Sequence, residues 1–282
     1  MVLGTPACST SLGTVSGMRI YVVDAFTDRP FRGNPAGVCL PDAAHADDVA
    51  WMQSVAAELG YSETAFAVPA TGGAADFGLR WFTPQTEVDL CGHATLATAH
   101  VLFGQGSAPA SRIRFATRSG VLTASLDSAG VVLDFPALPP REVPVPTELG
   151  LALGVEPILV AAGGDDLLVE VASAAAVRTV APDLAMLATL PYRAVIVTAA
   201  GEGRVDFVSR VFAPAVGVAE DPVTGSAHCV LGPFWAPRLD RRRMTGGQLS
   251  ARGGTVGVEL VGDRVRLSGA AVTVLEGDLI TD

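Results

Sequence analysis

The sequence predicts an α+β protein made of two similar halves, each a hairpin-rich sheet around a central helix. Three observations lead to this fold class. A stretch of the first half is repeated in the second half, each copy runs into a glycine-led helix start, and 31 Gly and 19 Pro residues provide many turns. The length of 282 residues is typical of two domains or one large one, and 49% hydrophobic residues suffice for a full core.

The repeat is a hairpin followed by a helix start. The first copy contains Asp76-Phe-Gly-Leu-Arg-Trp-Phe-Thr-Pro84, and the second contains Asp206-Phe-Val-Ser-Arg-Val-Phe-Ala-Pro214, 130 residues later. Asp, Phe, Arg, Phe and Pro occupy matching places. The helix starts that follow contain Gly92 and Gly225, with a three-residue insertion between the two registers. The repeat therefore predicts the same supersecondary unit twice.

The remaining elements follow from periodicity and turn residues. In the first half, the patterns predict strands over 19–26, 36–40, 64–68 and 77–82, and helices over 49–59 and from 92 to about 103. Asp47 or His45 is expected to cap the earlier helix, and Gly60 to end it.

The second half should contain a short helix over 182–190 and, after Gly225, a central helix that kinks or stops at Pro233. Residues 136–146 are Pro-rich and suggest a linker, and 255–279 alternate as strands do. Residues 1–17 are small and polar, so we interpret them as a flexible tail.

Charge and hydropathy exclude several classes of function. The nineteen basic residues are all Arg and are outnumbered by 29 acidic ones, which gives a net charge of −10. This argues against nucleic acid as a partner, and the lack of Lys excludes Schiff-base chemistry. No run of 18 apolar residues exists, so a membrane-bound protein is not expected.

The four cysteines, Cys8, Cys39, Cys91 and Cys229, form no CxxC pair. A zinc ribbon or a thioredoxin-type motif is therefore not expected. We interpret the cysteines as reduced thiols of a cytoplasmic protein.

The two glycine-led helix starts are candidate anion-binding elements. Free N–H groups and the helix dipole at a helix start favour an anion, so two facing starts could hold the carboxylate of a small acid between the halves. The alternative is that Gly92 and Gly225 only permit tight turns.

Four side chains near these starts are candidates for chemistry. Glu63 leads into an apolar strand and could be a general acid or base, or a solvated residue at a strand end. His93 could pass a proton or simply form a turn, and Asp221 could orient the substrate or cap the second helix. Cys91 could be a thiolate at a helix start, although a lone buried Cys is more often inert. His228, one turn into the second helix, is more readily explained as structural.

Other catalytic patterns are missing from the sequence. There is no G-x-S-x-G elbow, no P-loop and no G-x-G-x-x-G fingerprint, and the histidines are not spaced as metal ligands. The residues therefore favour acid/base chemistry without cofactor or metal.

Several of these motifs resemble a known family. Asp24–Val38, Ser62–Phe66, Cys91–Thr95 and Glu220–His228 are similar to motifs of the PhzF-like family, named for phenazine biosynthesis, and occur in the same order. The resemblance covers roughly residues 18–280. It is specific for the family but not for a substrate.

The resemblance implies a fold and a domain division. The family has the diaminopimelate-epimerase fold, in which two pseudo-symmetric domains each form a barrel-like sheet around a central helix. In that fold the last strand can return to the first domain. We therefore expect a first domain over 18–128 plus about 270–282, and a second over 129–269. The family also implies a homodimer that uses no cofactor.

The resemblance also implies roles for individual residues. The phenazine enzyme isomerises a dihydro-hydroxyanthranilate by moving a proton between carbons, and its proton-transferring glutamate matches Glu63. Its further site residues match His93, Asp221 and Ser226. We expect a small carboxylic acid as substrate, bound at Cys91, Gly92, Thr224, Gly225 and Ser226.

Two alternatives stay open at this point. Two-base racemases of this fold use a cysteine before each helix-start glycine, but here those places hold Cys91 and Thr224, which argues against symmetric racemisation. The first alternative to an isomerase is a dehydratase or lyase that uses the same glutamate. The second alternative is a non-catalytic protein that binds small acids.

Overall fold

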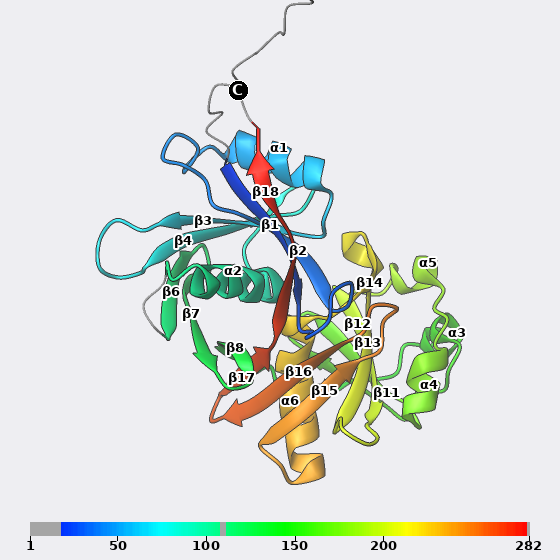
Figure 1. Ribbon diagram of the computed structural model, residues 1–282. Helices are drawn as coiled ribbons and strands as arrows, with labels where there is room; N and C mark the ends of the chain where they lie inside the picture. Colours follow the sequence, from blue (N-terminus) through cyan, green and yellow to red (C-terminus); the bar gives the residue numbers. More distant parts are fainter. Residues whose placement is uncertain (1–17, 108–110, 281–282) are drawn as a thin grey trace, which may run out of the picture.

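The computed structural model describes residues 18–107 and 111–280 (Figure 1). The tail expected at 1–17 lies outside the described residues. Every described strand joins one continuous network of paired strands, and six α-helices and a 3-10 turn (η1) connect or fill it.

The first part of the described chain contains β1 (Met18–Ala25), β2 (Asn34–Cys39), α1 (Val49–Leu59), β3 (Thr64–Pro69), β4 (Phe77–Phe82), β5 (Glu87–Val88), α2 (Gly92–Gly104), β6 (Arg112–Thr117), β7 (Gly120–Asp127) and β8 (Gly130–Pro136). The expected strands and helices of this part are all present. The cap of α1 is one residue from the expected place, because Asp48 and not Asp47 or His45 accepts the Trp51 N–H, at 2.9 Å.

The second part contains β9 (Arg141–Glu142), α3 (Leu149–Leu153), β10 (Leu159–Gly163), β11 (Asp166–Glu170), α4 (Ala174–Thr179), α5 (Leu184–Leu187), β12 (Ala194–Ala200), β13 (Phe207–Ala213), η1 (Pro214–Val216), β14 (Val218–Asp221), α6 (Gly225–Leu239), β15 (Arg243–Gln248), β16 (Gly254–Val261), β17 (Arg264–Gly269) and β18 (Ala271–Leu279). The Pro-rich stretch 136–146 is more ordered than a free linker, because its β9 pairs with β10.

The last strand returns to the first one. β18 pairs antiparallel with β1 from Met18↔Leu279 to Ala25↔Ala271, and β1 pairs with β2 on its other side (Figure 1). Farther along, β8 pairs with β7 and also with β17. These two connections join the sheets of both halves into one network.

The two central helices are buried on almost every side. α2 packs against β1, β2, β3, β7, β8 and β18, and α6 packs against β15, β16 and β17 (Figure 1). In α2 the residues from His93 to Ala99 are all buried. A helix that is enclosed in this way needs small and apolar residues all round rather than one apolar stripe, and its sequence supplies them.

The matched residues of the repeat make the same contacts in both halves. Arg80 on β4 binds Glu87 through Nε at 2.7 Å, and Arg210 on β13 binds Glu220 at the same distance. The Asp76 carboxylate accepts the Arg114 N–H at 2.7 Å, and the Asp206 carboxylate accepts the Thr245 N–H at 2.7 Å. The predicted α+β fold with two pseudo-symmetric halves is thereby confirmed.

The helix after Gly225 does not stop at Pro233, which was one of the two outcomes expected there. Pro233 lacks the N–H that would bond the Cys229 carbonyl four residues earlier. That carbonyl accepts the Leu138 N–H instead, at 2.9 Å, so the Pro-rich stretch 136–146 compensates for the missing bond. α6 therefore continues through Pro233 and Pro237 to Leu239.

Two hairpin glycines allow a test of the join between the halves. Gly130 has φ +114°, and a β-carbon there would be 2.4 Å from the Gly269 carbonyl oxygen, whereas Gly262 has φ +62° and open space. We expect Gly130→Ala to lower the free energy of unfolding by about 3 kcal/mol and Gly262→Ala by about 1 kcal/mol. Urea unfolding of both variants measures this, and equal losses would contradict the close packing at Gly130.

Candidate active site

Glu63 and His93 lie together at the start of the first central helix. Glu63 precedes β3, and its carbonyl accepts the Gly37 N–H at 3.2 Å, which fixes its backbone to β2. His93 is the second residue of α2. The Glu63 Oε2 and the His93 Nε2 are 3.3 Å apart, with side chains 21% and 7% exposed. A buried imidazole thus contacts a carboxylate that solvent can reach.

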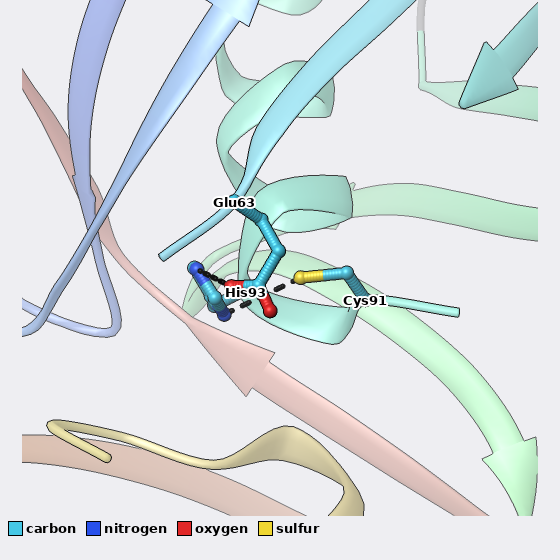
Figure 2. Close-up of side chains that lie close together, drawn as sticks. All are labelled: Glu63, Cys91 and His93. Atoms are coloured by element: carbon cyan, nitrogen blue, oxygen red, sulfur yellow. Dashed lines mark hydrogen bonds and ion pairs between the residues drawn. The ribbon is translucent and has the colours of Figure 1, made fainter. Parts of the chain in front are cut away.

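Cys91 lies close to both of these side chains (Figure 2). Its Sγ is 3.5 Å from the His93 Nδ1. Burial and the neighbouring Glu63 carboxylate raise the pKa of the Cys91 thiol well above its usual range. Cys91 is therefore a neutral thiol at neutral pH, not the thiolate that the helix start alone would favour.

Glu63, Cys91 and His93 offer ligand atoms within 4.8 Å of one another, and these are the atom types that zinc prefers. The Nδ1 atom of the imidazole faces the thiol and its Nε2 atom faces the carboxylate. The same contacts can pass a proton between the carboxylate and the imidazole.

Asp221 and Thr224 form a second cluster before α6. The Thr224 hydroxyl donates to Asp221 Oδ2 at 2.5 Å, and the Asn34 amide donates to Asp221 Oδ1 at 2.8 Å. Burial raises the pKa of Asp221, and the nearby His93 opposes that rise.

Gln248 completes this cluster and was not among the residues predicted from the sequence. Its carbonyl oxygen accepts the Thr224 N–H at 2.8 Å, and its amide donates to the Asp221 carbonyl at 2.7 Å and to the Thr224 hydroxyl at 3.1 Å. Gln248 is 1% exposed. Its buried amide therefore fixes the loop that holds both Asp221 and Thr224.

The two helix starts meet backbone to backbone. A β-carbon built on Gly92 would lie 3.6 Å from the Gly225 Cα, and the reverse contact is also 3.6 Å. Neither preceding residue, Cys91 or Thr224, makes a side-chain cap bond to its helix. The first N–H groups of both helices are therefore not capped by these residues, which suits an anion at this meeting point.

Ser226 contacts Arg193, a residue that was not predicted from the sequence to belong to the site. Its Oγ accepts a hydrogen bond from Arg193 Nη2 at 3.0 Å, and the same nitrogen donates to Asp166 Oδ2 at 2.6 Å. The structure thus distributes the predicted residues among three neighbouring groups. Glu63, Cys91 and His93 form one, Asp221 and Thr224 another, and Ser226 with Arg193 the third, while Gly92 and Gly225 join the two helix starts.

Comparison with known proteins identifies the family. The sequence profile described as phenazine biosynthesis-like protein (PhzC-PhzF) matches residues 23–277. The chain belongs to this family. An uncharacterized isomerase of Pseudomonas aeruginosa is 52% identical over 260 residues, which are 92% of this chain and 97% of that protein.

Solved structures agree with this membership. A PhzF family protein of Enterococcus faecalis is 40% identical, with a TM-score of 0.88 over 93% of this chain and 99% of that one. A hydroxyproline epimerase of Agrobacterium vitis is 12% identical, with a TM-score of 0.59 over 94% and 93% of the chains, and shares the fold alone. These likenesses confirm the epimerase-like α+β fold expected for the PhzF-like family. In the described part of the chain, no helix is long and apolar enough to cross a membrane.

His228 supports the second cluster from within α6. It is fully buried, and its Nδ1 is 2.8 Å from the Thr224 carbonyl, which can only accept, so Nδ1 carries the hydrogen. Burial lowers the pKa of His228 to about 4. The imidazole is thus neutral in the folded protein at any pH above that value, as a structural role requires.

This buried histidine predicts a loss of stability in acid. Between its unfolded pKa of about 6.5 and its folded value, the unfolded chain binds a proton that the folded protein does not. Stability should therefore fall as the pH drops from about 6.5 to 4, by up to about 3 kcal/mol from this residue. Urea unfolding at several pH values should show a shallower pH dependence for His228→Gln than for the wild type. Identical pH dependences would contradict the assignment.

Proposed function

We propose that this protein is a cofactor-independent isomerase of a small unsaturated cyclic carboxylic or amino acid, with Glu63 as the proton-transferring group. The observation that carries the proposal is the Glu63 carboxylate, partly open to solvent, in contact with the buried His93 imidazole beside the two helix starts. The isomerase named among the relatives supports the same reaction class. The substrate class follows from the family resemblance and from the anion-binding character of the helix starts.

The reaction begins with a proton moving from a substrate carbon to Glu63. The C–H bond breaks, its electron pair enters the conjugated system of the substrate, and the Glu63 carboxylate becomes a carboxylic acid. The same group then returns the proton to another carbon, so the product has the mass of the substrate. His93 contacts the Glu63 carboxylate at 3.3 Å and holds it in position for both transfers.

The other residues hold the substrate while the proton moves. The first N–H groups of α2 and α6, with the Ser226 hydroxyl, bind the substrate carboxylate at the Gly92 and Gly225 meeting point. Asp221 and Thr224 bind polar substituents of the ring. Cys91, a neutral thiol, lines the site next to His93 and takes no proton from carbon.

Solvent proton exchange tests the role of Glu63. In deuterated water, incubation with trans-2,3-dihydro-3-hydroxyanthranilate and a panel of unsaturated cyclic amino acids should give deuterium uptake or rearrangement. Glu63→Gln should lower the rate by at least about a hundredfold, since it removes the proton-carrying group. The matched control Glu58→Gln changes an exposed glutamate of α1 and should keep the wild-type rate. Mass spectrometry and NMR read the products.

The same experiment separates the alternatives. A product lighter by one water would indicate the dehydratase or lyase, in which His93 protonates a leaving hydroxyl after Glu63 removes the proton. Ligand binding without any turnover, unaffected by Glu63→Gln, would indicate a non-catalytic binding protein. Exchange that survives Glu63→Gln would overturn the proposed mechanism.

Independence from metals has its own test. Because a proton shift by the Glu63 carboxylate needs no metal ion, we expect the exchange rate to survive dialysis against EDTA unchanged. Metal content and rate would be measured before and after dialysis. A rate that falls and is restored by Zn²⁺ would make Glu63, Cys91 and His93 a metal site. The homodimer and the cytoplasmic location stay predictions from the resemblance and the composition.

A further inference from the structure

Arg193 lies next to the proposed substrate site and is held there from behind. It immediately precedes β12, and its N–H donates to the Asp165 carbonyl at 2.8 Å. Its Nη2 lies between the carboxylate of Asp166 and the hydroxyl of Ser226, at 2.6 and 3.0 Å. The Asp166 side chain is 3% exposed, whereas that of Arg193 is 37% exposed. A buried anion thus anchors a guanidinium that is still partly open to solvent.

The internal repeat gives Arg193 a counterpart beside Glu63. In the first hairpin Thr64 pairs with Phe82, and in the second Val195 pairs with Phe212. Phe82 and Phe212 are matched residues of the repeat, so Ser62 corresponds to Arg193 and Glu63 to Ala194. Gly92 corresponds to Gly225, and therefore His93 corresponds to Ser226.

The two halves thus build the same contact with opposite charges. In each half, a side chain from the residues just before the hairpin touches the second residue of the central helix. In the first half the contact is Glu63 with His93, and in the second it is Arg193 with Ser226. The contact of the first half therefore includes an anionic side chain, and that of the second half includes a cationic side chain, which is paired with Asp166.

The hydrogen bond from Arg193 also determines whether the Ser226 hydroxyl can donate to a ligand. An arginine side chain only donates hydrogen bonds, so the Ser226 oxygen is an acceptor in this contact. Its own hydrogen then points elsewhere and is available to a ligand acceptor. Together with the N–H groups at the start of α6, Ser226 and Arg193 present donors only, which favours a carboxylate over a neutral group.

We propose that Arg193, anchored by Asp166, is the positioning residue that orients the substrate, by keeping the Ser226 hydroxyl as a donor to the substrate carboxylate. This inference rests on the proposed function. The carboxylate is drawn to the Arg193 end and repelled from the Glu63 end. The ring carbons consequently face Glu63, where the proton is exchanged. Arg193 therefore determines specificity for acids over their neutral analogues.

A pair of ligands that differ only in charge tests this assignment. We would measure binding of 3-hydroxyanthranilate and of its neutral carboxamide, 2-amino-3-hydroxybenzamide, by titration calorimetry. The variant is Arg193→Gln with Asp166→Asn, because removing the arginine alone would leave a buried carboxylate without a partner. The matched control, Arg204→Gln, changes an exposed arginine of the same half.

We expect the double variant to weaken binding of the acid at least about tenfold and binding of the amide less than about twofold. KM for the acid substrate should rise by a similar factor while kcat changes less. Because Arg193 acts through Ser226, adding Ser226→Ala to the double variant should weaken acid binding little further. Arg204→Gln should behave as the wild type.

Several outcomes would overturn the inference. Unchanged acid binding in the double variant would show that Arg193 does not orient the carboxylate, and equal weakening of acid and amide would show a merely structural role. In both cases Glu63-dependent exchange in the wild type would still uphold the proposed function. A wild-type protein that neither binds the acid nor exchanges protons would overturn both proposals.

Discussion

The close approach of two helix starts is the constraint on which the rest of the structure depends. Gly92 and Gly225 bring the backbones of α2 and α6 together, with a β-carbon position of each 3.6 Å from the Cα of the other. The residues before and after these glycines are thereby gathered around one meeting point of the two halves. Strands β18 and β8 fix the approach, because they pair the sheet of one half with that of the other.

Duplication explains why this site has two ends of different character. The repeat preserves the framework in both halves, as in the ion pairs of Arg80 with Glu87 and Arg210 with Glu220. The positions that face the meeting point have diverged. Cys91 matches Thr224, and His93 matches Ser226. One half thus supplies a carboxylate with an imidazole, and the other supplies hydroxyls, a guanidinium and the Asp221 carboxylate. A site of this kind suits a one-base proton shift on an oriented acid rather than a symmetric reaction with two thiols.

The sequence was sufficient for the framework because local patterns determine it. The alternation of the hairpins, the glycines of the helix starts and the five matched residues of the repeat predicted both halves. Glu63, His93 and Asp221 could be named as candidates because they lie within short recognisable segments. The helix does not stop at Pro233, because the distant Leu138 N–H donates to the carbonyl that proline leaves without its helical bond.

Residues that act from a distance could not be found in this way. Gln248 lies on β15 and reaches back to Thr224, and Asp166 reaches Ser226 only through Arg193. Neither belongs to a motif, and their roles depend on strand pairings that bring separate segments together. Arg193 could be recognised only once the strand pairing was known. The registers of the two hairpins align Glu63 with Ala194, the residue after Arg193. These registers come from the structure and cannot be read from the sequence.

A crystal structure with bound 3-hydroxyanthranilate would test the central claim most directly. The account predicts that the carboxylate lies between the starts of α2 and α6, within hydrogen-bond distance of Ser226, and that the ring faces the Glu63 carboxylate. A carboxylate bound at the Glu63 end, or a ligand bound away from the two glycines, would contradict it.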